Sequence, residues 1–485
     1  MGKIKHVLFV NPYPRLAKTI MEASNLPPVG LCYTAAYLES KGVKCSIIDA
    51  RVLKINEWEV VRQIKEKDPD LVGISFNVAT LTEAETISKA CKTYGKRVIM
   101  GGPLPTENLK MLLERSKADC IVRGEGELVT WEIIQAFNSK KPLKEVNGLT
   151  ILDENGEVIN TPEAERIEDL DSLPFPAYHL VPDLGLYRNR SRKHPIAPLV
   201  THRGCPYGCT FCGSQRTGFR PRSPENVIQE MEYMINKFGV KQFDILDDNF
   251  TLDQGRAEKI LDMIIAKGWD IGIIFPNGLR ADRLTEPLVE KMAKGGVYRT
   301  GIGIESGNQK IVDGIVKSLR LEQVKQSVKW LRKNNIIVFG YYQFGLPGET
   351  KETMQETIDF AKEVNTHWAN FGITTPLPGT QLYSQLKSEG LIKESEASLG
   401  QGFYAIKEGQ YTPKGLTKEE VEAYQQKAWR SFYFRPKKMV DVLKTIRSYR
   451  ELEWTVSTAA PILKGLVAKS VRNVFGNGVG KNQNL

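Results

Sequence analysis

Three closely spaced cysteines constrain this chain more than any other feature. Cys205, Cys209 and Cys212 lie in Thr-His-Arg-Gly-Cys-Pro-Tyr-Gly-Cys-Thr-Phe-Cys-Gly-Ser, residues 201–214. Three thiolates on one loop can bind three irons of a [4Fe–4S] cluster, whereas ordinary electron-transfer clusters use four cysteines. The fourth iron is then open to a small molecule. The alternative is a zinc site, for which His202 can supply the fourth ligand that zinc needs.

Length and composition describe a folded protein of several domains. The 485 residues exceed one ordinary domain, and 41% hydrophobic and 26% charged residues are typical of a globular chain. No segment approaches the roughly 20 apolar residues of a membrane span, and we see no signal peptide. The seven cysteines are odd in number and mostly scattered, which argues against a disulfide framework. We therefore expect a cytoplasmic protein with buried free thiols at Cys32, Cys45, Cys91 and Cys120.

Residues 1–140 alternate strand-like apolar runs with helical patterns. We expect strands at 7–11, 45–49, 71–75, 97–101 and 120–123, and helices at about 30–40, 57–67, 81–94, 106–116 and 127–138. This alternation predicts an α/β domain with a doubly wound parallel sheet. Ligands of such sheets bind beyond the carboxyl ends of the strands. Those ends lead here into loops at 11–12, 75–80 and 101–106.

A second strand–helix series follows a linker. The linker, residues 141–194, is rich in proline and acidic residues and holds a hairpin at 149–160 with Asn155-Gly156 as its turn. Across 195–385 we expect strands at 197–201, 242–247, 271–277, 299–304, 336–344 and 368–374. Six such units predict a partial (β/α)6 barrel whose working face is the carboxyl end of the strands. Residues 386–485 form a C-terminal helical region with a basic tail.

The cysteine spacing, Phe211 and the preceding Arg-Gly-Cys-Pro resemble the radical S-adenosylmethionine (SAM) superfamily. The resemblance implies that the open iron chelates SAM and that one electron then yields a 5′-deoxyadenosyl radical. It also places SAM contacts at the strand ends of the barrel, where carboxylates suit the SAM ammonium and a guanidinium suits its carboxylate. The implied residues are Phe211, Asp247, Asp248, Asn277, Arg280, Glu305, Ser306, Gly345 and Gly348.

The first domain resembles the cobalamin-binding domain that precedes many radical SAM cores. The matching pieces are Pro27-Pro28-Val29-Gly30-Leu31, Val72-Gly73-Ile74-Ser75, Gly101-Gly102-Pro103 and Arg123-Gly124-Glu125-Gly126-Glu127. The implied cobalamin contacts are Asn11, Ser75, Asn77, Thr80, Gly101, Gly102, Pro103 and Glu125. The Asp-x-His-x-x-Gly signature of a cobalt-ligating histidine is absent, and Leu104 stands where a histidine is frequent. The alternative is a flavodoxin-like sheet that has lost its cofactor and only shapes the substrate site.

The net charge of +10 is concentrated near one end of the chain. Residues 427–485 contain twelve Lys or Arg against three acids, a net charge of +9. Residues 458–475 also place apolar side chains on one broad face, the pattern of a peripheral contact with an anionic membrane. The alternative is a helix packed on the barrel. Nucleic-acid binding is disfavoured, because the basic charge is confined to this appendage.

The combined resemblance is to class B radical SAM methyltransferases and to the anaerobic magnesium-protoporphyrin monomethyl ester cyclases. It predicts a cobalamin-dependent enzyme acting on an unactivated carbon of a small hydrophobic substrate, such as an isoprenoid, a lipid or a tetrapyrrole. Either a methyl group moves to the substrate radical, or the radical is oxidised or closes a ring. The cluster needs an electron donor such as a flavodoxin or a ferredoxin. A radical SAM enzyme that modifies RNA or a peptide is disfavoured, because we find no added RNA-binding module and no further cluster cysteines.

Overall fold

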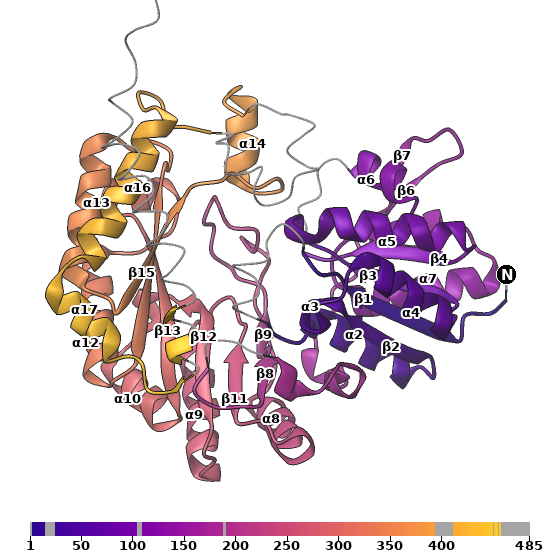
Figure 1. Ribbon diagram of the computed structural model, residues 1–485, viewed down its shortest axis with the longest axis horizontal. Coiled ribbons are helices and arrows are strands. Elements are labelled where there is room, and N and C mark those ends of the chain that lie inside the picture. The colour runs from indigo at the N-terminus through magenta and orange to yellow at the C-terminus, as the bar shows by residue number, and fades with distance from the viewer. Residues whose placement is uncertain are drawn as a thin grey trace, which may run out of the picture.

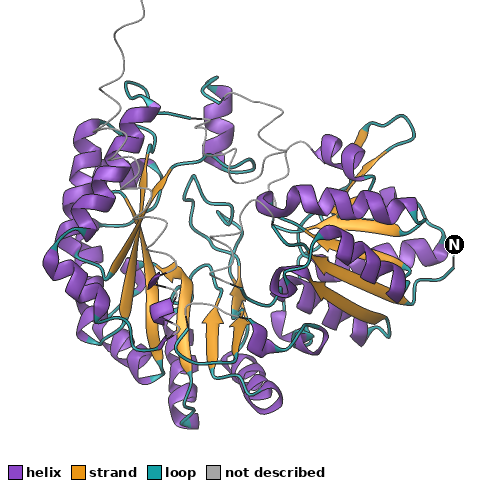
Figure 2. Cartoon of the chain, viewed as in Figure 1, coloured by secondary structure: helices purple, strands orange, loops and turns teal. Residues whose placement is uncertain are grey.

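The chain folds into two α/β domains that lie side by side, with the last helices on the outer side of the second domain (Figure 1). The computed structural model describes residues 2–14, 25–103, 109–187, 191–392, 411–449, 451–453 and 455–456. Each domain consists of a sheet covered by helices (Figure 2). The predicted fold class is confirmed: a doubly wound α/β domain, a partial barrel and C-terminal helices.

The first domain is built on a seven-stranded sheet in the order β2-β1-β3-β4-β5-β6-β7. Its first five strands are parallel and have the order of flavodoxin-like folds, in which ligands bind where the order reverses between β1 and β3. The strands are β1 (His6–Asn11), β2 (Lys44–Asp49), β3 (Leu71–Ser75), β4 (Arg97–Gly101), β5 (Cys120–Val122), β6 (Leu149–Leu152) and β7 (Val158–Asn160).

The sheet of the first domain continues past residue 140 into the segment predicted as a linker. The hairpin β6–β7, which the sequence pattern placed in the linker, pairs antiparallel with β5 and extends the same sheet. Leu149 and Ile151 of β6 are buried in the core of this sheet. The hairpin therefore covers the backbone edge that β5 would otherwise expose.

Helices cover both faces of this sheet, because neighbouring strand residues point to opposite sides. Leu8 and Val10 belong to the core on one face, whereas Val7 and Phe9 belong to the core on the other. The first face carries α4 (Glu57–Lys67), α5 (Leu81–Thr93) and α6 (Leu109–Ser116), and the second carries α2 (Val29–Ser40) and α7 (Gly126–Ser139); the short α3 (Ala50–Leu53) follows β2. The four predicted free thiols are buried.

The second domain is an open barrel of six parallel strands in the order β15-β14-β13-β12-β11-β8. The spatial order follows the chain order, so each connection moves one strand along the sheet, as in (β/α) barrels. The strands are β8 (Ile196–Leu199), β11 (Gln242–Ile245), β12 (Gly272–Leu279), β13 (Val297–Glu305), β14 (Ile337–Phe344) and β15 (Trp368–Ile373). A separate ladder of β9 (His202–Arg203) and β10 (Arg220–Pro221) lies after β8.

Local sequence signals set the limits of the barrel helices. The first begins where Ser223 accepts a hydrogen bond from the Asn226 N–H, with Pro224 at its first position, and ends at Gly239 with φ of 63°. The helices are α8 (Pro224–Phe238), α9 (Gln254–Lys267), α10 (Glu286–Lys294), α11 (Gln309–Gly314), α12 (Leu321–Lys333), α13 (Lys351–Val364) and α14 (Gln381–Ser388).

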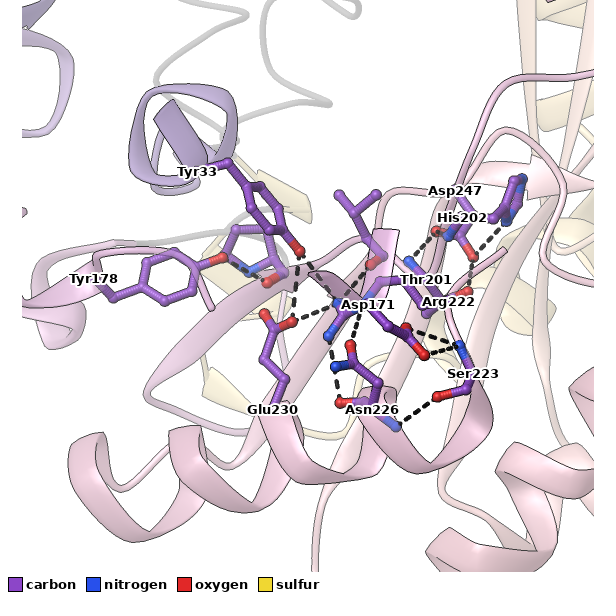
Figure 3. Close-up of polar contacts among 12 residues, drawn as sticks. Tyr33, Asp171, Tyr178, Thr201, His202, Arg222, Ser223, Asn226, Glu230 and Asp247 are labelled. Atoms are coloured by element: carbon purple, nitrogen blue, oxygen red, sulfur yellow. Dashed lines mark hydrogen bonds and ion pairs between the residues drawn. The ribbon is translucent and has the colours of Figure 1, made fainter. Parts of the chain in front are cut away.

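A buried polar network joins the two domains (Figure 3). Arg222 Nη1 donates to the hydroxyl oxygen of Tyr33 on α2 at 3.2 Å, and this hydroxyl donates to Glu230 on α8 at 3.5 Å. Arg222 and Glu230 form an ion pair of 2.5 Å, and their side chains are 4% and 1% exposed. The first domain is thus attached to the barrel through polar groups that are almost fully buried.

The segment predicted as a linker packs against both domains. The Ala177 N–H donates to the Cys32 carbonyl at 3.0 Å, and the Tyr178 hydroxyl donates to the Pro198 carbonyl at 2.9 Å. Asp171 accepts a hydrogen bond from the Ser223 N–H at 3.0 Å, at the start of α8 (Figure 3). These contacts fix α2 of the first domain against β8 and α8 of the second.

Two C-terminal helices, α16 (Lys418–Tyr433) and α17 (Pro436–Leu443), lie on the outside of the barrel near α12 and α13 (Figure 1). The predicted capping box of Thr417 and Glu420 opens α16. The amphipathic stretch expected at 458–475 lies outside the described residues. No helix in the described part of the chain is long and apolar enough to cross a lipid bilayer.

Replacing Arg222 tests the network between the domains. The variant R222M leaves the Glu230 carboxylate buried without its cation, and such a loss costs about 3–5 kcal/mol. We expect a clearly lower unfolding temperature in calorimetry. The control E225Q lies on the same helix as Glu230 and removes only an exposed ion pair with Lys259. Its unfolding temperature should not change, because exposed ion pairs contribute little. An R222M protein as stable as the unsubstituted chain would show that the network does not hold the domains together.

Candidate active site

The three predicted ligand cysteines lie on one loop between β9 and β10, which we call the cluster loop. The Cys205 N–H donates to Thr217 Oγ1, and the Thr217 N–H donates to the Cys205 carbonyl, both at 3.0 Å. Gly204 has φ of 85° and no room for a Cβ, which would lie 2.7 Å from the Gly218 carbonyl oxygen. The loop is therefore held in a defined shape by the chain itself.

The three thiols lie close together. Cys209 is buried, and Cys205 and Cys212 are partly buried. Burial raises the pKa values of Cys205 and Cys212, and negative charge on the neighbouring thiols and on Asp248 raises them further. Among the described residues, no three His, Cys, Asp or Glu side chains converge on a single metal ion. Three neighbouring thiols on one loop fit a cluster in which each thiolate binds a different iron.

Both ring nitrogens of His202 have partners other than a metal, so His202 does not complete a zinc site. Its ring is fully buried, with Nδ1 3.0 Å from Asp247 Oδ2. Its Nε2 accepts a hydrogen bond from the Asn249 N–H at 3.4 Å. The remaining donor set is three thiolates, which fits a [4Fe–4S] cluster with one open iron. Such a cluster supplies the single electron for cleavage of SAM.

Two of the predicted SAM contacts, Phe211 and Asp248, lie at the cluster loop, and a third, Asn277, lies next to the end of β11. Asp248, just after β11, accepts a hydrogen bond from the Ser214 hydroxyl at 3.1 Å. Phe211 lies on the loop itself and packs on apolar side chains that follow α11 and β14. Asn277 of β12 is exposed and donates to the Leu246 carbonyl at 2.7 Å. Their contacts with SAM stay predictions.

Glu305 ends β13 beside a cation that the sequence gave no reason to select. Its φ of 68° is uncommon for a residue with a side chain. One carboxylate oxygen lies 2.8 Å from Lys317 Nζ, and the other accepts from Gln343 at 2.8 Å. The Lys317 ammonium also faces the Phe211 ring at 5.8 Å. A buried ion pair therefore lies beside Phe211 of the cluster loop.

Two predicted SAM contacts, Asp247 and Ser306, are buried and already have partners within the protein. Asp247 accepts a hydrogen bond from the Thr201 N–H at 2.7 Å and pairs with His202. Burial alone would raise the pKa of Asp247, but His202 and Thr201 hold it below its usual value. Ser306 is fully buried and shares a hydrogen bond of 3.1 Å with the Thr357 hydroxyl. Both side chains therefore support the strand ends, and their contacts with SAM stay predictions.

Arg280 also has its partners within the protein, and its contact with the SAM carboxylate stays a prediction. Its guanidinium carbon lies 3.6 Å from the centroid of the Tyr207 ring on the cluster loop. Its nitrogens donate to Asp282 and to the Ser318 carbonyl, each at 2.9 Å. The Arg280 guanidinium therefore packs against Tyr207 of the cluster loop, while its N–H groups bind Asp282 and the Ser318 carbonyl.

Gly345 and Gly348 shape the turn after β14, with φ of 84° and 79°. Glu349 closes this turn, because its Oε2 accepts from the N–H groups of Gly345 at 2.6 Å and Leu346 at 3.0 Å. Burial raises the pKa of Glu349 to about 7. The backbone of this turn stays the predicted contact for the adenine of SAM.

All eight predicted cobalamin contacts line one cavity of about 630 Å³ in the first domain. They come from the carboxyl ends of β1, β3 and β4 and from the start of α7. They are Asn11, Ser75, Asn77, Thr80, Gly101, Gly102, Pro103 and Glu125. Val200 and Arg203 of the second domain also line this cavity. The cavity therefore lies between the domains, next to the cluster loop.

The cavity wall admits only a bare backbone at Gly102. Its φ is 138°, and a Cβ there would lie 2.2 Å from the Phe76 carbonyl oxygen. A wall without side chains lets a flat ring approach the backbone, so these residues fit a corrin. Asn77 and Thr80 cap one another across the turn η1 (Val78–Thr80) and so shape the adjoining loop. Cobalamin bound here would supply a cobalt that carries a methyl group.

Glu125 lines the cavity, but its carboxylate is held by two arginines of the cluster loop. Arg220 approaches it at 2.6 and 3.1 Å, and Arg203 at 3.1 Å. Arg203 also pairs with Glu127 at 2.6 Å. Burial alone would raise the pKa of Glu125, but these two guanidinium groups hold it below its usual value. Sequence reasoning missed both arginines, although they flank the cysteines on either side.

Replacement of the three cysteines tests the cluster assignment. Because the loop offers only these thiolates, alanine at 205, 209 and 212 together should abolish the reconstituted [4Fe–4S] absorbance and 5′-deoxyadenosine formation. The control C91A removes a thiol buried in the other domain and should retain both signals. A complete four-iron cluster in the triple variant would contradict the assignment.

The ligand below cobalt is a second testable feature. No histidine lines the cavity in the described part of the chain, and residues 104–108, outside it, include none. We therefore expect paramagnetic resonance of the bound cob(II)alamin form to lack splitting from a histidine nitrogen of the protein. Clear splitting that disappears on exchange of a protein histidine would contradict this.

Comparison with known proteins agrees with this geometry. Residues 199–361 match the radical SAM superfamily, and residues 22–134 match the B12 binding domain. An uncharacterized methyltransferase of Pyrococcus horikoshii is 32% identical over 90% of this chain and 94% of its own length. The anaerobic magnesium-protoporphyrin IX monomethyl ester cyclase of Rubrivivax gelatinosus is 28% identical over 78% of this chain and 70% of its own.

A solved structure shows the same fold. The cobalamin-dependent SAM radical enzyme OxsB, with aqua-cobalamin and SAM bound, has a TM-score of 0.74 at 18% identity, covering 94% of this chain and 72% of that one. The two matched domains coincide with the cavity and the cluster loop. The chain therefore belongs to the cobalamin-dependent radical SAM family of methyltransferases and related cyclases, whose cofactors are a [4Fe–4S] cluster, SAM and cobalamin.

Proposed function

We propose that this enzyme transfers a methyl group from SAM to an unactivated carbon of a small hydrophobic substrate. The observation that carries the proposal is the position of the cobalamin cavity, which shares Arg203 with the cluster loop. Radical formation alone needs only the cluster, whereas methyl transfer needs both cofactors close to one substrate. The methyltransferase name of the relative from Pyrococcus horikoshii supports this choice.

The substrate class within the proposal is an isoprenoid, a lipid or a tetrapyrrole. The relative from Rubrivivax gelatinosus is named for a tetrapyrrole substrate, which favours the last of these. The same relative also supports a second candidate function, in which the substrate radical is oxidised or closes a ring and no methyl group moves. In either case a flavodoxin- or ferredoxin-like protein would supply single electrons to the cluster.

The chain's own residues suggest how the site would be organised. Lys317 and Glu305 form a charged pair beside Phe211, where they can orient the amino-acid part of SAM. Arg203 and Arg220 hold the loop against Glu125. The substrate would then lie between the cluster loop and the glycine wall at Gly102, since that is where the two cofactor sites adjoin.

Anaerobic turnover with methyl-labelled SAM tests the proposal. The substrates are extracted tetrapyrroles, isoprenoids and lipids, with a chemical reductant. Methyl transfer should place the label in a product and convert one SAM to S-adenosylhomocysteine for each SAM cleaved to methionine and 5′-deoxyadenosine. Formation of 5′-deoxyadenosine with an oxidised or cyclised, unlabelled product would support the second candidate instead.

A variant of Gly102 tests the role of cobalamin separately from that of the cluster. G102V should lose cobalamin and the labelled product, because the wall has no room for a side chain. It should retain the cluster and form 5′-deoxyadenosine, since the cluster loop lies in the other domain. Labelled product at the normal rate from a G102V protein without cobalamin would overturn the proposal.

A further inference from the structure

The helix α17 is oriented against the usual rule for surface helices. Lys438 is its buried residue, at 2% exposure, whereas Met439, Val440 and Leu443 are 55%, 52% and 62% exposed. At 3.6 residues per turn these three apolar side chains share one side of the helix, roughly opposite Lys438. Phe434, just before the helix, is also 54% exposed. The apolar side of α17 therefore faces away from the protein.

Ionic contacts fix this orientation. The Lys438 ammonium donates to the Thr366 carbonyl at 2.7 Å and to Asp441 at 2.8 Å. Asp441 also accepts from both terminal nitrogens of Arg332 on α12, at 3.0 and 3.1 Å. A rotation that buried Met439 and Leu443 would break these contacts. The exposed apolar side is thus a consequence of how the helix is attached.

Positive charge lies next to the apolar side. A cavity of about 1000 Å³ beside α17 is lined by two acids, Glu363 and Asp441, and by six cationic side chains: Arg332, Lys362, Arg435, Lys437, Lys438 and Lys444. Asp441 is already paired with Arg332 and Lys438. The cavity therefore has more cations than acids, and Lys437 and Lys444 are exposed to solvent at its edge.

Exposed apolar side chains are also concentrated here. Of the fourteen large hydrophobic side chains that are exposed in the described part of the chain, seven lie between Phe434 and Val456. Large apolar patches with a polar rim mark interaction surfaces. We define the α17 surface as Phe434, Met439, Val440 and Leu443 together with Lys437 and Lys444.

We propose that the α17 surface docks on an anionic lipid bilayer. Its apolar side chains would enter the boundary between headgroups and acyl chains while the two lysines contact lipid phosphates. Docking does not depend on which substrate the enzyme methylates. In Figure 1, α17 lies at the edge of the barrel far from the first domain, so the first domain would lie away from the bilayer.

Charge argues against the two other occupants of this surface. A second copy of the chain, docked by the same surface, would bring two cationic cavities together. Residues 457–485, which follow the described part, contain four Lys or Arg and no acid, so covering α17 with them would also place cations beside cations. An anionic bilayer instead attracts both α17 and that segment.

Sedimentation of the full-length, cluster-reconstituted protein with vesicles tests the proposal. The vesicles contain phosphatidylcholine alone or equal parts of phosphatidylcholine and phosphatidylglycerol. We expect binding only to the anionic vesicles and release as salt rises, since exposed charges are screened beyond about 10 Å at moderate salt. The double variant M439S/L443S should bind at least about tenfold more weakly. The double variant K437E/K444E should also lose more than about tenfold, because each lysine contributes about fivefold.

Matched controls separate the α17 surface from general effects. W58S removes an exposed apolar side chain on α4, and K67E/K89E reverses two exposed lysines of the first domain. Both should bind like the unsubstituted protein. L443W should bind more tightly, because tryptophan favours the membrane interface, and a misfolded variant would not produce such a gain.

Several results would overturn the proposal. One is no binding to anionic vesicles, and another is full binding by both α17 double variants, which would place the contact elsewhere. Binding that begins only when the chain is ended after Val456 would show that the last residues cover α17. A dimer in solution that M439S/L443S dissociates would identify a second copy as the occupant. Each variant is first checked for its cluster absorbance and unfolding temperature.

Discussion

The arrangement of the active site depends on the ion pairs between Glu125 and the two arginines of the cluster loop. Arg203 and Arg220 lie on the two strands that close this loop, so one carboxylate holds both of its ends. Glu125 also accepts a hydrogen bond from the Ile167 N–H at 3.2 Å. Charge-assisted pairs with several donors on one carboxylate are strong and directional. The position of the cluster loop is therefore set by the wall of the cobalamin cavity.

The ligand-binding edges of the two sheets face one another, so this contact joins the two cofactor sites. Parallel α/β sheets bind ligands at the carboxyl ends of their strands, and so do barrels. Here the cavity at the ends of β1, β3 and β4 includes residues that follow β8 of the barrel. The buried contacts of Tyr33 with Arg222 and Glu230 keep the two edges facing one another. Two sites on separate domains thus become one active site.

Local patterns in the sequence were enough to predict the strands, the cysteine loop and the cavity wall. The cysteines and Gly102 are recognisable because their spacing or their lack of a side chain is itself the signal. The partners of these groups were not predictable, since pairs such as Arg203 with Glu127 are 76 positions apart. The direction of a side chain at a strand end also escaped prediction. Asp247 and Ser306 lie where expected but point into the protein.

The orientation of α17 also could not be predicted from the sequence, because it depends on competing energies. Periodicity reveals that Met439, Val440 and Leu443 share a side, but it does not reveal which way that side faces. Burying one such side chain stabilises a fold by about 1.5–3 kcal/mol, whereas burial disfavours the charged Lys438 and lowers its pKa to about 8. Turning the helix over would bury these apolar side chains but would break the contacts of Lys438 and Asp441 with Thr366 and Arg332. A helix held in this way gains its apolar burial only when something else covers it.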